Sequence, residues 1–132
     1  MCVFCEIIAG NIPGSKVYED DDVLAILDLS QVTRGHTLVM PKKHYANLIE
    51  ADEETAVKCM KVIHRLSAQL VKNTGASGLN VLNNCGAVAG QSVEHLHFHL
   101  IPRYSENDAI SIVFNESEKQ DLNEVLHQVT GK

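Results

Sequence analysis

The stretch His95-Leu96-His97-Phe98-His99-Leu100-Ile101-Pro102-Arg103 alternates histidine with apolar residues at its start. Successive side chains of a β-strand point to opposite faces, so a strand here that ends at Pro102 presents three imidazoles in one row, about 7 Å apart. The intervening residues are buried on the other face. Such a row suits a nucleophile with its supports, or a metal site. A purely structural role fits less well, because each buried imidazole would need its own hydrogen-bond partner.

The segments upstream of this stretch predict a short helix followed by three strands. Gly10, Pro13 and Gly14 limit a helix begun around residues 4–9 to one or two turns. Alternating or β-branched runs predict strands at residues 16–19, 23–28 and 36–40. Because their connections are too short for crossover helices, we expect an antiparallel meander.

Helical spacing of apolar residues predicts one long helix over residues 52–73, with Gly75 as its C-terminal cap. The recurring positions are Ala56, Cys59 or Met60, Ile63, Leu66 and Leu70. His64, on the same helix, is interpreted as an ordinary surface residue. A strand at residues 78–83 and a loop at residues 84–91 are expected to follow.

A shorter helix is predicted near the C-terminus. Ser117 and Gln120 have the spacing of a capping box that would begin it. Its apolar face would hold Leu122, Val125, Leu126 and Val129. The predicted elements together define an α+β fold.

Length and composition predict a single domain over residues 1–132, with a core at 1–103 and a tail with its helix at 104–132. The chain is 45% hydrophobic, which suffices for one core. A net charge of −6 and a pI near 5.6 argue against nucleic-acid binding, although a local site can still take a small phosphate ligand. The N-terminus lacks a basic and apolar leader and no run is long enough to span a membrane, so we expect a cytoplasmic protein.

The pair Cys2-x-x-Cys5 leaves three interpretations open. A redox pair of the thioredoxin kind needs a preceding strand, which residue 2 cannot have. Two separate thiols are a second possibility. Half of a zinc site is the third, although no second cysteine pair follows at zinc-finger spacing. Four cysteines in a chain with its own core do not indicate a disulfide scaffold.

Gly86 and Gly90, in the loop before the histidines, permit a close approach of backbone amides to an anion. The loop and strand together, residues 90–103, resemble the signature of the histidine triad (HIT) superfamily. The resemblance extends upstream through residues 2–20, Asp28 and residues 35–44. It implies the HIT fold, an antiparallel meander sheet with one long helix and a shorter C-terminal helix, and a homodimer in which the two sheets combine.

The resemblance also implies a nucleotide hydrolase that acts at the α-phosphorus through a covalent nucleotidyl-histidine. His97 would be the nucleophile, and neutral imidazole suits this role near pH 7. His99 and the loop amides would hold the nonbridging phosphate oxygens. Ser92 and Gln91 would lie beside the leaving group, and His36 would support the triad, whose first member is His95.

The same resemblance assigns the remaining substrate contacts. Asn84 and Gly90 would shape the phosphate end of the site, and Asp28 would accept from the ribose hydroxyls. Phe4, Ile7 and Leu29 would line a base pocket, although core packing explains these three equally well. HIT relatives with the N-terminal cysteine pair carry a structural zinc, which here would take Cys2, Cys5, His44 and His95. No catalytic metal is expected.

A purine nucleoside phosphoramidate is the favoured substrate, because the chain has little outside residues 84–91 and the tail to hold a second nucleotide. The alternatives are a dinucleoside polyphosphate (Ap4A-type) hydrolase and a non-catalytic nucleotide-binding module. A metal-dependent hydrolase would need three ligands from one straight strand, which span too far for one ion. Cys85, Ala87, Val88 and Ala89 in the loop, with the Ile-Pro-Arg end of the strand, are similar to the bacterial branch of the family.

Overall fold

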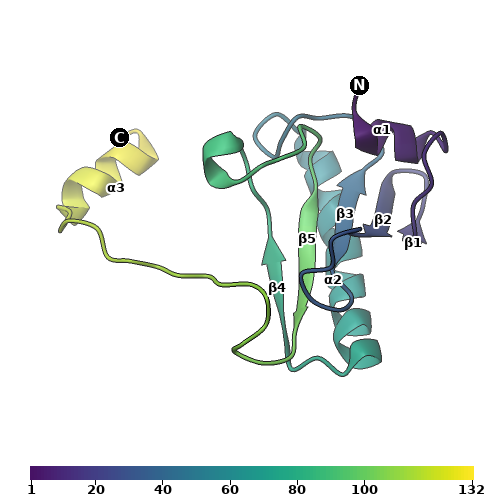
Figure 1. Ribbon diagram of the computed structural model, residues 1–132. Helices are drawn as coiled ribbons and strands as arrows, with labels where there is room; N and C mark the ends of the chain where they lie inside the picture. The colour runs from purple at the N-terminus through teal and green to yellow at the C-terminus, as the bar shows by residue number, and fades with distance from the viewer.

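The computed structural model describes all of residues 1–132 and contains one five-stranded antiparallel sheet (Figure 1). The strand order is β1-β2-β3-β5-β4. The strands are β1 (Lys16–Glu19), β2 (Val23–Leu27), β3 (Thr37–Pro41), β4 (Gly78–Leu82) and β5 (Phe98–Arg103). The first three form the expected meander. The order then departs from a simple meander, because a long helix carries the chain to the far edge and β5 returns between β4 and β3.

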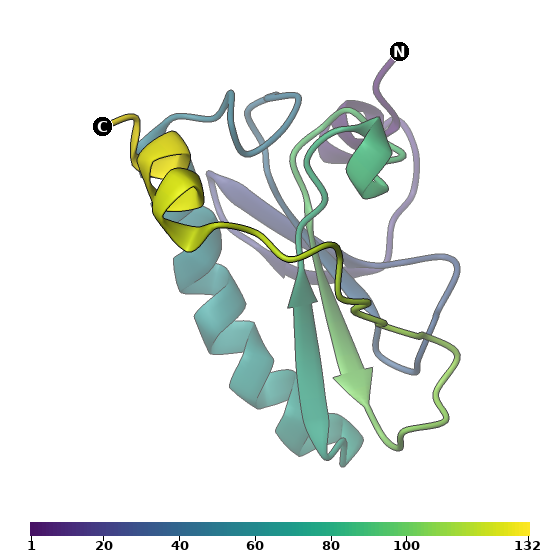
Figure 2. The same ribbon diagram turned by 90° about the vertical axis from the view of Figure 1, so that its left-hand side faces the viewer.

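The long helix α2 (Glu53–Thr74) lies along one face of the sheet (Figures 1 and 2). Asp52 caps its first turn by accepting from the Thr55 backbone N–H, at 2.8 Å, and Gly75 ends it in the left-handed conformation. The prediction is confirmed with a shift of one residue at each end. Cys59 and not Met60 faces the core: Cys59 is fully buried, whereas Met60 is 49% exposed.

Alternation along the strands builds a core on each face of the sheet. Val23 and Ala25 of β2 pack with α2, together with Leu96, Phe98 and Leu100. Leu24 and Ile26 face the other side, where they pack against Phe4 and Ile7 of the short helix α1 (Val3–Ile8). The period-2 pattern therefore places α2 and α1 on opposite faces.

The histidine stretch enters the sheet later than predicted. Hydrogen-bonded pairing of β5 begins at Phe98, and residues 95–97 precede it. Strand β3 ends at Pro41, which has no N–H to donate to the ladder. The Pro41 carbonyl accepts from the His95 side chain, and the Leu96 N–H donates to the Tyr45 carbonyl, at 2.7 Å. The side chains still alternate, and the expected separation of imidazoles from apolar residues is retained.

The C-terminal helix α3 (Leu122–Thr130) exists as predicted, but its predicted cap was wrong. Asp121 is the N-cap, and its carboxylate accepts from the Asn123 N–H at 3.0 Å. Ser117 and Gln120 both donate instead to the Glu118 carbonyl. Ser117 lies about one turn before the N-cap, too early to reach the first helical amides. Figures 1 and 2 show residues 104–132 leaving the body as an arm. No helix has the length and apolar content that crossing a bilayer requires.

Candidate active site

A pocket of about 270 Å³ opens at the end of the sheet where the histidines lie. It brings together seven residues that the sequence nominated: Phe4, Ile7, Asp28, Leu29, Ser92, His97 and His99. Five lining residues were missed: Val3, Ile26, Leu27, Leu38 and Val93. Ile26 and Leu38 lie on the face of the sheet that packs against Phe4, so the alternation along β2 and β3 could have identified them. His36, Asn84, Gly90, Gln91 and His95 do not line the pocket.

His97 presents one free ring nitrogen in a fixed orientation. Its Nδ1 lies 2.7 Å from the His95 carbonyl oxygen, and because a carbonyl can only accept, Nδ1 carries the proton. The Nε2 lone pair therefore remains available. The side chain is only 6% exposed, yet no buried polar atom of the protein lacks a partner, so the unpaired Nε2 belongs to the accessible part of the ring.

Two contacts hold the His97 ring and backbone. Phe4 packs edge-on against the ring, with centroids 5.0 Å apart. Asn83, directly after β4, donates from Nδ2 to the His97 carbonyl oxygen at 2.9 Å. Asn83 was missed by the sequence analysis, which placed it at a strand end, and nothing in its own segment indicates that it pairs with residue 97.

His36 and His99 form a hydrogen-bonded chain that ends in the pocket. The Val32 N–H donates to Nδ1 of His36 at 3.3 Å, so His36 carries its proton on Nε2. That Nε2 lies 2.9 Å from Nδ1 of His99 and donates to it. The His99 proton is then on Nε2, which leaves a donor beside His97, whose ring centroid is 5.1 Å away.

Burial keeps the hydrogen-bonded pair His36 and His99 neutral near pH 7. Burial, with a further contribution from nearby His97, lowers the pKa of His99 to about 4. Burial also lowers the pKa of His36, against the opposing effect of Asp28, whose Oδ2 lies 3.6 Å from the His36 Nε2. The donor and acceptor pattern of this pair requires that both rings be neutral.

Gly35 precedes His36 with φ +98°, where a Cβ would come within 3.2 Å of Pro102 Cγ.

The glycine loop is held mainly by its own hydrogen bonds. Gln91 accepts from the Gly86 N–H at 2.8 Å and donates to the carbonyls of Ala46 and Val93, at 2.6 and 2.9 Å. Gly90 has φ +99°, and a Cβ there would lie 3.2 Å from Nδ2 of Asn84. The N–H groups of residues 89–91 donate to carbonyls of the same loop. Gln91, Asn84 and Gly90 therefore shape the loop. Ser92, the residue that follows it, reaches the pocket.

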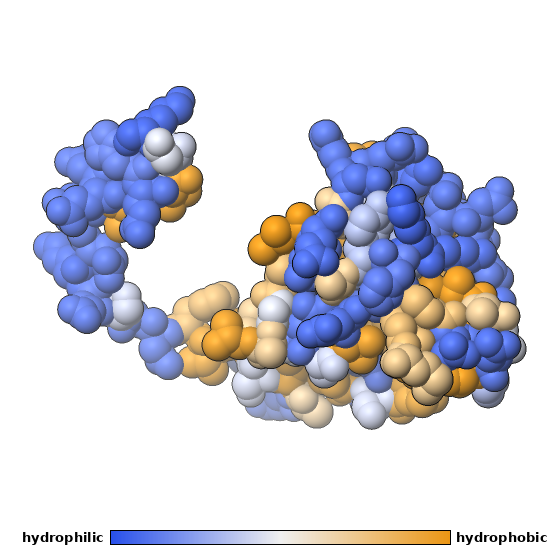
Figure 3. All heavy atoms as spheres, turned by 90° about the horizontal axis from the view of Figure 1, so that it is seen from above, coloured by the Kyte–Doolittle hydropathy of each residue, from blue (hydrophilic) through white to orange (hydrophobic).

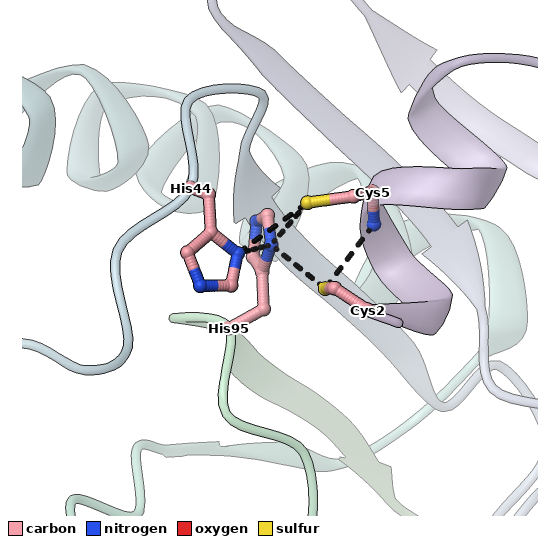
Figure 4. Close-up of side chains that lie close together, drawn as sticks. All are labelled: Cys2, Cys5, His44 and His95. Atoms are coloured by element: carbon pink, nitrogen blue, oxygen red, sulfur yellow. Dashed lines mark hydrogen bonds between the residues drawn. The ribbon is translucent and has the colours of Figure 1, made fainter.

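Cys2, Cys5, His44 and His95 converge beside the pocket, with ligand atoms all within 4.8 Å of one another (Figure 4). Nε2 of His95 donates to the Pro41 carbonyl at 2.8 Å, which turns the unprotonated Nδ1 toward the cluster. This Nδ1 lies 3.4 Å from Cys2 Sγ, 3.5 Å from Cys5 Sγ and 3.1 Å from His44 Nδ1. Tetrahedral zinc with ordinary Zn–S and Zn–N bonds separates sulfur from nitrogen by about 3.5 Å. The donor set fits that ion.

Comparison with known proteins agrees with this geometry. Residues 9–106 match the HIT domain family. The chain is 46% identical over 131 residues to an uncharacterized HIT-like protein of Methanocaldococcus jannaschii, across 99% of this chain and 100% of that one. The crystal structure of a HIT family member from Bacillus subtilis superposes with a TM-score of 0.92 at 43% identity, and the match covers 99% of this chain and 96% of that one.

A relative with a named activity is the adenosine 5'-monophosphoramidase of Schizosaccharomyces pombe. It is 36% identical over 111 residues, which cover 84% of this chain and 80% of that protein. The chain therefore belongs to the HIT family of nucleotide-binding and nucleotide-hydrolysing proteins.

The low pKa of His99 predicts an acid-dependent loss of stability. Between about pH 6.5 and pH 4 the unfolded chain binds a proton at this histidine and the folded protein does not, so stability falls as pH falls through that window. His99→Gln removes the titration. Urea unfolding at pH 7 and pH 4.5 should show the wild type losing up to about 2 kcal/mol more than the variant. Burial lowers the pKa of His95 as well, but that histidine is present in both proteins, so its contribution cancels. Equal losses would contradict the assignment.

Proposed function

We propose that this protein is a nucleotide hydrolase that cleaves the P–N bond of a purine nucleoside phosphoramidate and releases the nucleoside monophosphate. The observation that carries the proposal is the tautomer of His97, whose Nδ1 is tied to a carbonyl while Nε2 is free at the pocket. A relative named as an adenosine 5'-monophosphoramidase supports the reaction class.

The reaction would proceed in two displacements at phosphorus. The Nε2 lone pair of His97 attacks the α-phosphorus, the P–N bond breaks, and the leaving nitrogen takes a proton from solvent and departs as an amine. The nucleotidyl-imidazole so formed carries positive charge, which the Nδ1–H bond to the His95 carbonyl stabilises. Water then attacks the same phosphorus, the P–N bond to His97 breaks, and the monophosphate leaves while the proton lost by the water returns to solvent.

His99 would stabilise the charge that develops on phosphate oxygen. Its Nε2–H is the donor at the end of the His36 chain, and because His36 accepts from Val32, the direction of every proton in the chain is set before substrate binds. A donor held in advance requires no reorganisation in the transition state. Ser92, which also lines the pocket, would contact the leaving group.

Nucleoside recognition would involve Asp28 and the apolar wall. One carboxylate oxygen of Asp28 accepts from the Ser30 N–H at 2.8 Å, which orients the other toward the pocket and His36. That oxygen would accept from a ribose hydroxyl. Leu29, 101% exposed at the rim, would cover one side of a base, whereas Phe4 and Ile7 are buried and form its floor. These contacts suit a large flat ring and read no base edge.

The nucleophile can be tested by trapping. His97→Ala should reduce turnover of adenosine phosphoramidate by about 10³-fold or more, while binding of the monophosphate persists, because the ribose and base contacts lie elsewhere. Intact-protein mass spectrometry during turnover should detect a nucleotidyl adduct, located on residue 97, in the wild type alone. His127→Ala, an exposed histidine of α3, is the matched control and should retain full rate. Residual activity of more than a few per cent in His97→Ala would refute the role.

Substrate preference separates the phosphoramidate from a dinucleoside tetraphosphate. A pocket of about 270 Å³ has room for little more than one nucleotide, so the phosphoramidate should have the higher kcat/KM. The two compounds are compared at equal concentration without added metal. A tetraphosphate rate ten times higher, or about 1.4 kcal/mol in transition-state preference, would replace the substrate and leave the covalent mechanism in place.

We also propose that Cys2, Cys5, His44 and His95 hold a structural zinc. The support is the donor chemistry and the spacing of the four ligand atoms, together with the second hydrogen bond of His95, which sets its tautomer as zinc-binding histidines require. The ion would join α1 to the residues just before β5. Four protein ligands leave no open position, so its contribution would be to folding and not to the chemical step.

Elemental analysis of protein purified without added metal should find one zinc per chain. Removing it, or replacing Cys5 with Ser, should lower Tm and leave kcat nearly unchanged, because the ion stabilises the fold and does not contact substrate. Cys85→Ser changes a free cysteine outside the cluster and should retain the zinc. A metal-free protein in which Cys2 and Cys5 both titrate as free thiols would overturn the assignment.

A further inference from the structure

Three side chains at the candidate site also form a set of metal ligands. Asp28, His36 and His99 each offer one ligand atom, and the three atoms lie within 4.8 Å of one another. His36 Nε2 is 2.9 Å from His99 Nδ1 and 3.6 Å from Asp28 Oδ2. Ligand atoms on one divalent transition metal are separated by about 3 to 4 Å, because each metal bond is about 2.1 Å long. Two imidazoles and a carboxylate are donors that such ions accept.

Backbone hydrogen bonds hold this ligand set in place. Asp28 directly follows β2, and His36 directly precedes β3. The Asp28 N–H donates to the His36 carbonyl at 3.0 Å, and Nε2 of Gln31 donates to the carbonyls of both residues, at 2.6 and 2.8 Å. The Ser30 N–H binds one oxygen of Asp28 at 2.8 Å, and the other oxygen faces His36. Hydrogen bonds of this kind orient the ligands of metal sites.

The ligand set can be reached from the pocket. Asp28 and His99 line the pocket, whereas the His36 side chain is buried. The C-terminal arm stands away from the body (Figure 3), and none of its residues lines the pocket. Three protein ligands leave a coordination position open to water. They also hold an ion less tightly than the four ligands of the cysteine cluster, so this site would fill only when metal is added.

One proton has to move before an ion can bind. The lone pair of His99 Nδ1 already points to the set, but Nε2 of His36 carries the proton that it donates to His99. Moving this proton to Nδ1 of His36 gives up the bond from the Val32 N–H, which at 3.3 Å is longer than an ordinary N–H hydrogen bond. The Ser30 backbone lies within hydrogen-bond reach of the His36 ring and can accept the moved proton. The ring stays neutral, and the ion takes the place of the proton between the two histidines.

We propose that Asp28, His36 and His99 bind a divalent transition-metal ion such as Zn²⁺, and that this ion competes with a nucleotide for the pocket. Binding of the ion stands on the ligand geometry alone. The competition rests on the proposed function, in which Asp28 accepts from a ribose hydroxyl. In the ion-bound protein, Oδ2 of Asp28 is a metal ligand, and water on the ion fills the space beside it. The ion is therefore an inhibitor and takes no part in the chemical step.

Counting bound zinc tests the site. Wild type and variants are dialysed against a series of buffered free Zn²⁺ concentrations, and zinc per chain is measured by elemental analysis. His36→Gln should bind one zinc fewer than the wild type, whether or not the cysteine cluster is filled. His64→Gln, the same change at an exposed histidine of α2, should bind as many as the wild type. Equal zinc content in wild type and His36→Gln at every concentration would overturn the site.

A second variant guards against a folding defect in the first. Asp28→Asn keeps the shape of the side chain and removes its charge, so it should raise the dissociation constant of this zinc at least tenfold. Circular dichroism shows whether each variant is folded. An unchanged dissociation constant in folded Asp28→Asn would also overturn the site.

The competition is measured with adenosine monophosphate as the probe. Saturating Zn²⁺ should raise its dissociation constant at least tenfold in the wild type, and by linkage the nucleotide should weaken zinc binding by the same factor. In His36→Gln the effect of Zn²⁺ should be less than twofold, which also corrects for zinc bound by the nucleotide itself. Equal effects in the two proteins would refute the competition. If no protein binds the nucleotide, the proposed function fails, and the zinc count still decides the metal site.

Discussion

The hydrogen bond from Nδ1 of His97 to the carbonyl oxygen of His95 is the interaction on which the site depends. It decides which nitrogen of His97 is free and aims that nitrogen at the pocket. Its acceptor is itself held, because the fully buried His95 ring donates to the Pro41 carbonyl and turns Nδ1 to the cysteine cluster. His95 thus links the His97 imidazole, the end of β3 and the N-terminal helix.

The hydrogen bonds of the site histidines fix which ring nitrogen carries the proton. Each imidazole of the site has one nitrogen committed to a fixed partner. The other nitrogen faces the pocket in His97 and His99, faces the cluster in His95, and donates to His99 in His36. The partners are mostly backbone groups, which cannot change their donor or acceptor character with pH. Burial lowers the pKa of His99 and His36 and keeps both rings neutral, so one set of tautomers persists near pH 7.

The rest of the fold supports this arrangement from two sides. On the α2 face, Leu96, Phe98 and Leu100 hold the histidine segment in the larger core. On the opposite face, Phe4 and Ile7 of α1 contribute both to a second core and to the pocket wall. The sequence left core packing and substrate contact open for these residues, and their position permits both. The arm takes part in neither core, and its apolar residues remain exposed in the single chain.

Local pattern was enough to determine the elements and the separation of faces. The alternation of His95 to Leu100 predicted which residues face the core, and the apolar spacing of residues 52–73 predicted α2. Cys2-x-x-Cys5 left half of a zinc site open as one of three interpretations. Each of these signals is carried by residues close in sequence, where strand or helix periodicity applies directly. The family resemblance supplied the expected roles of the site residues, and the comparisons confirmed the family.

Tertiary structure decided whatever depends on groups far apart in the chain. Only the folded protein shows that β5 begins to pair with β3 at residue 98, that Asn83 holds the His97 carbonyl, and that Gln91 closes its own loop and does not line the pocket. The tautomers belong to this class as well, because a proton's position on imidazole is set by whichever carbonyl or amide lies across from it. Periodicity states which way a side chain points; the partner it meets there is decided by packing.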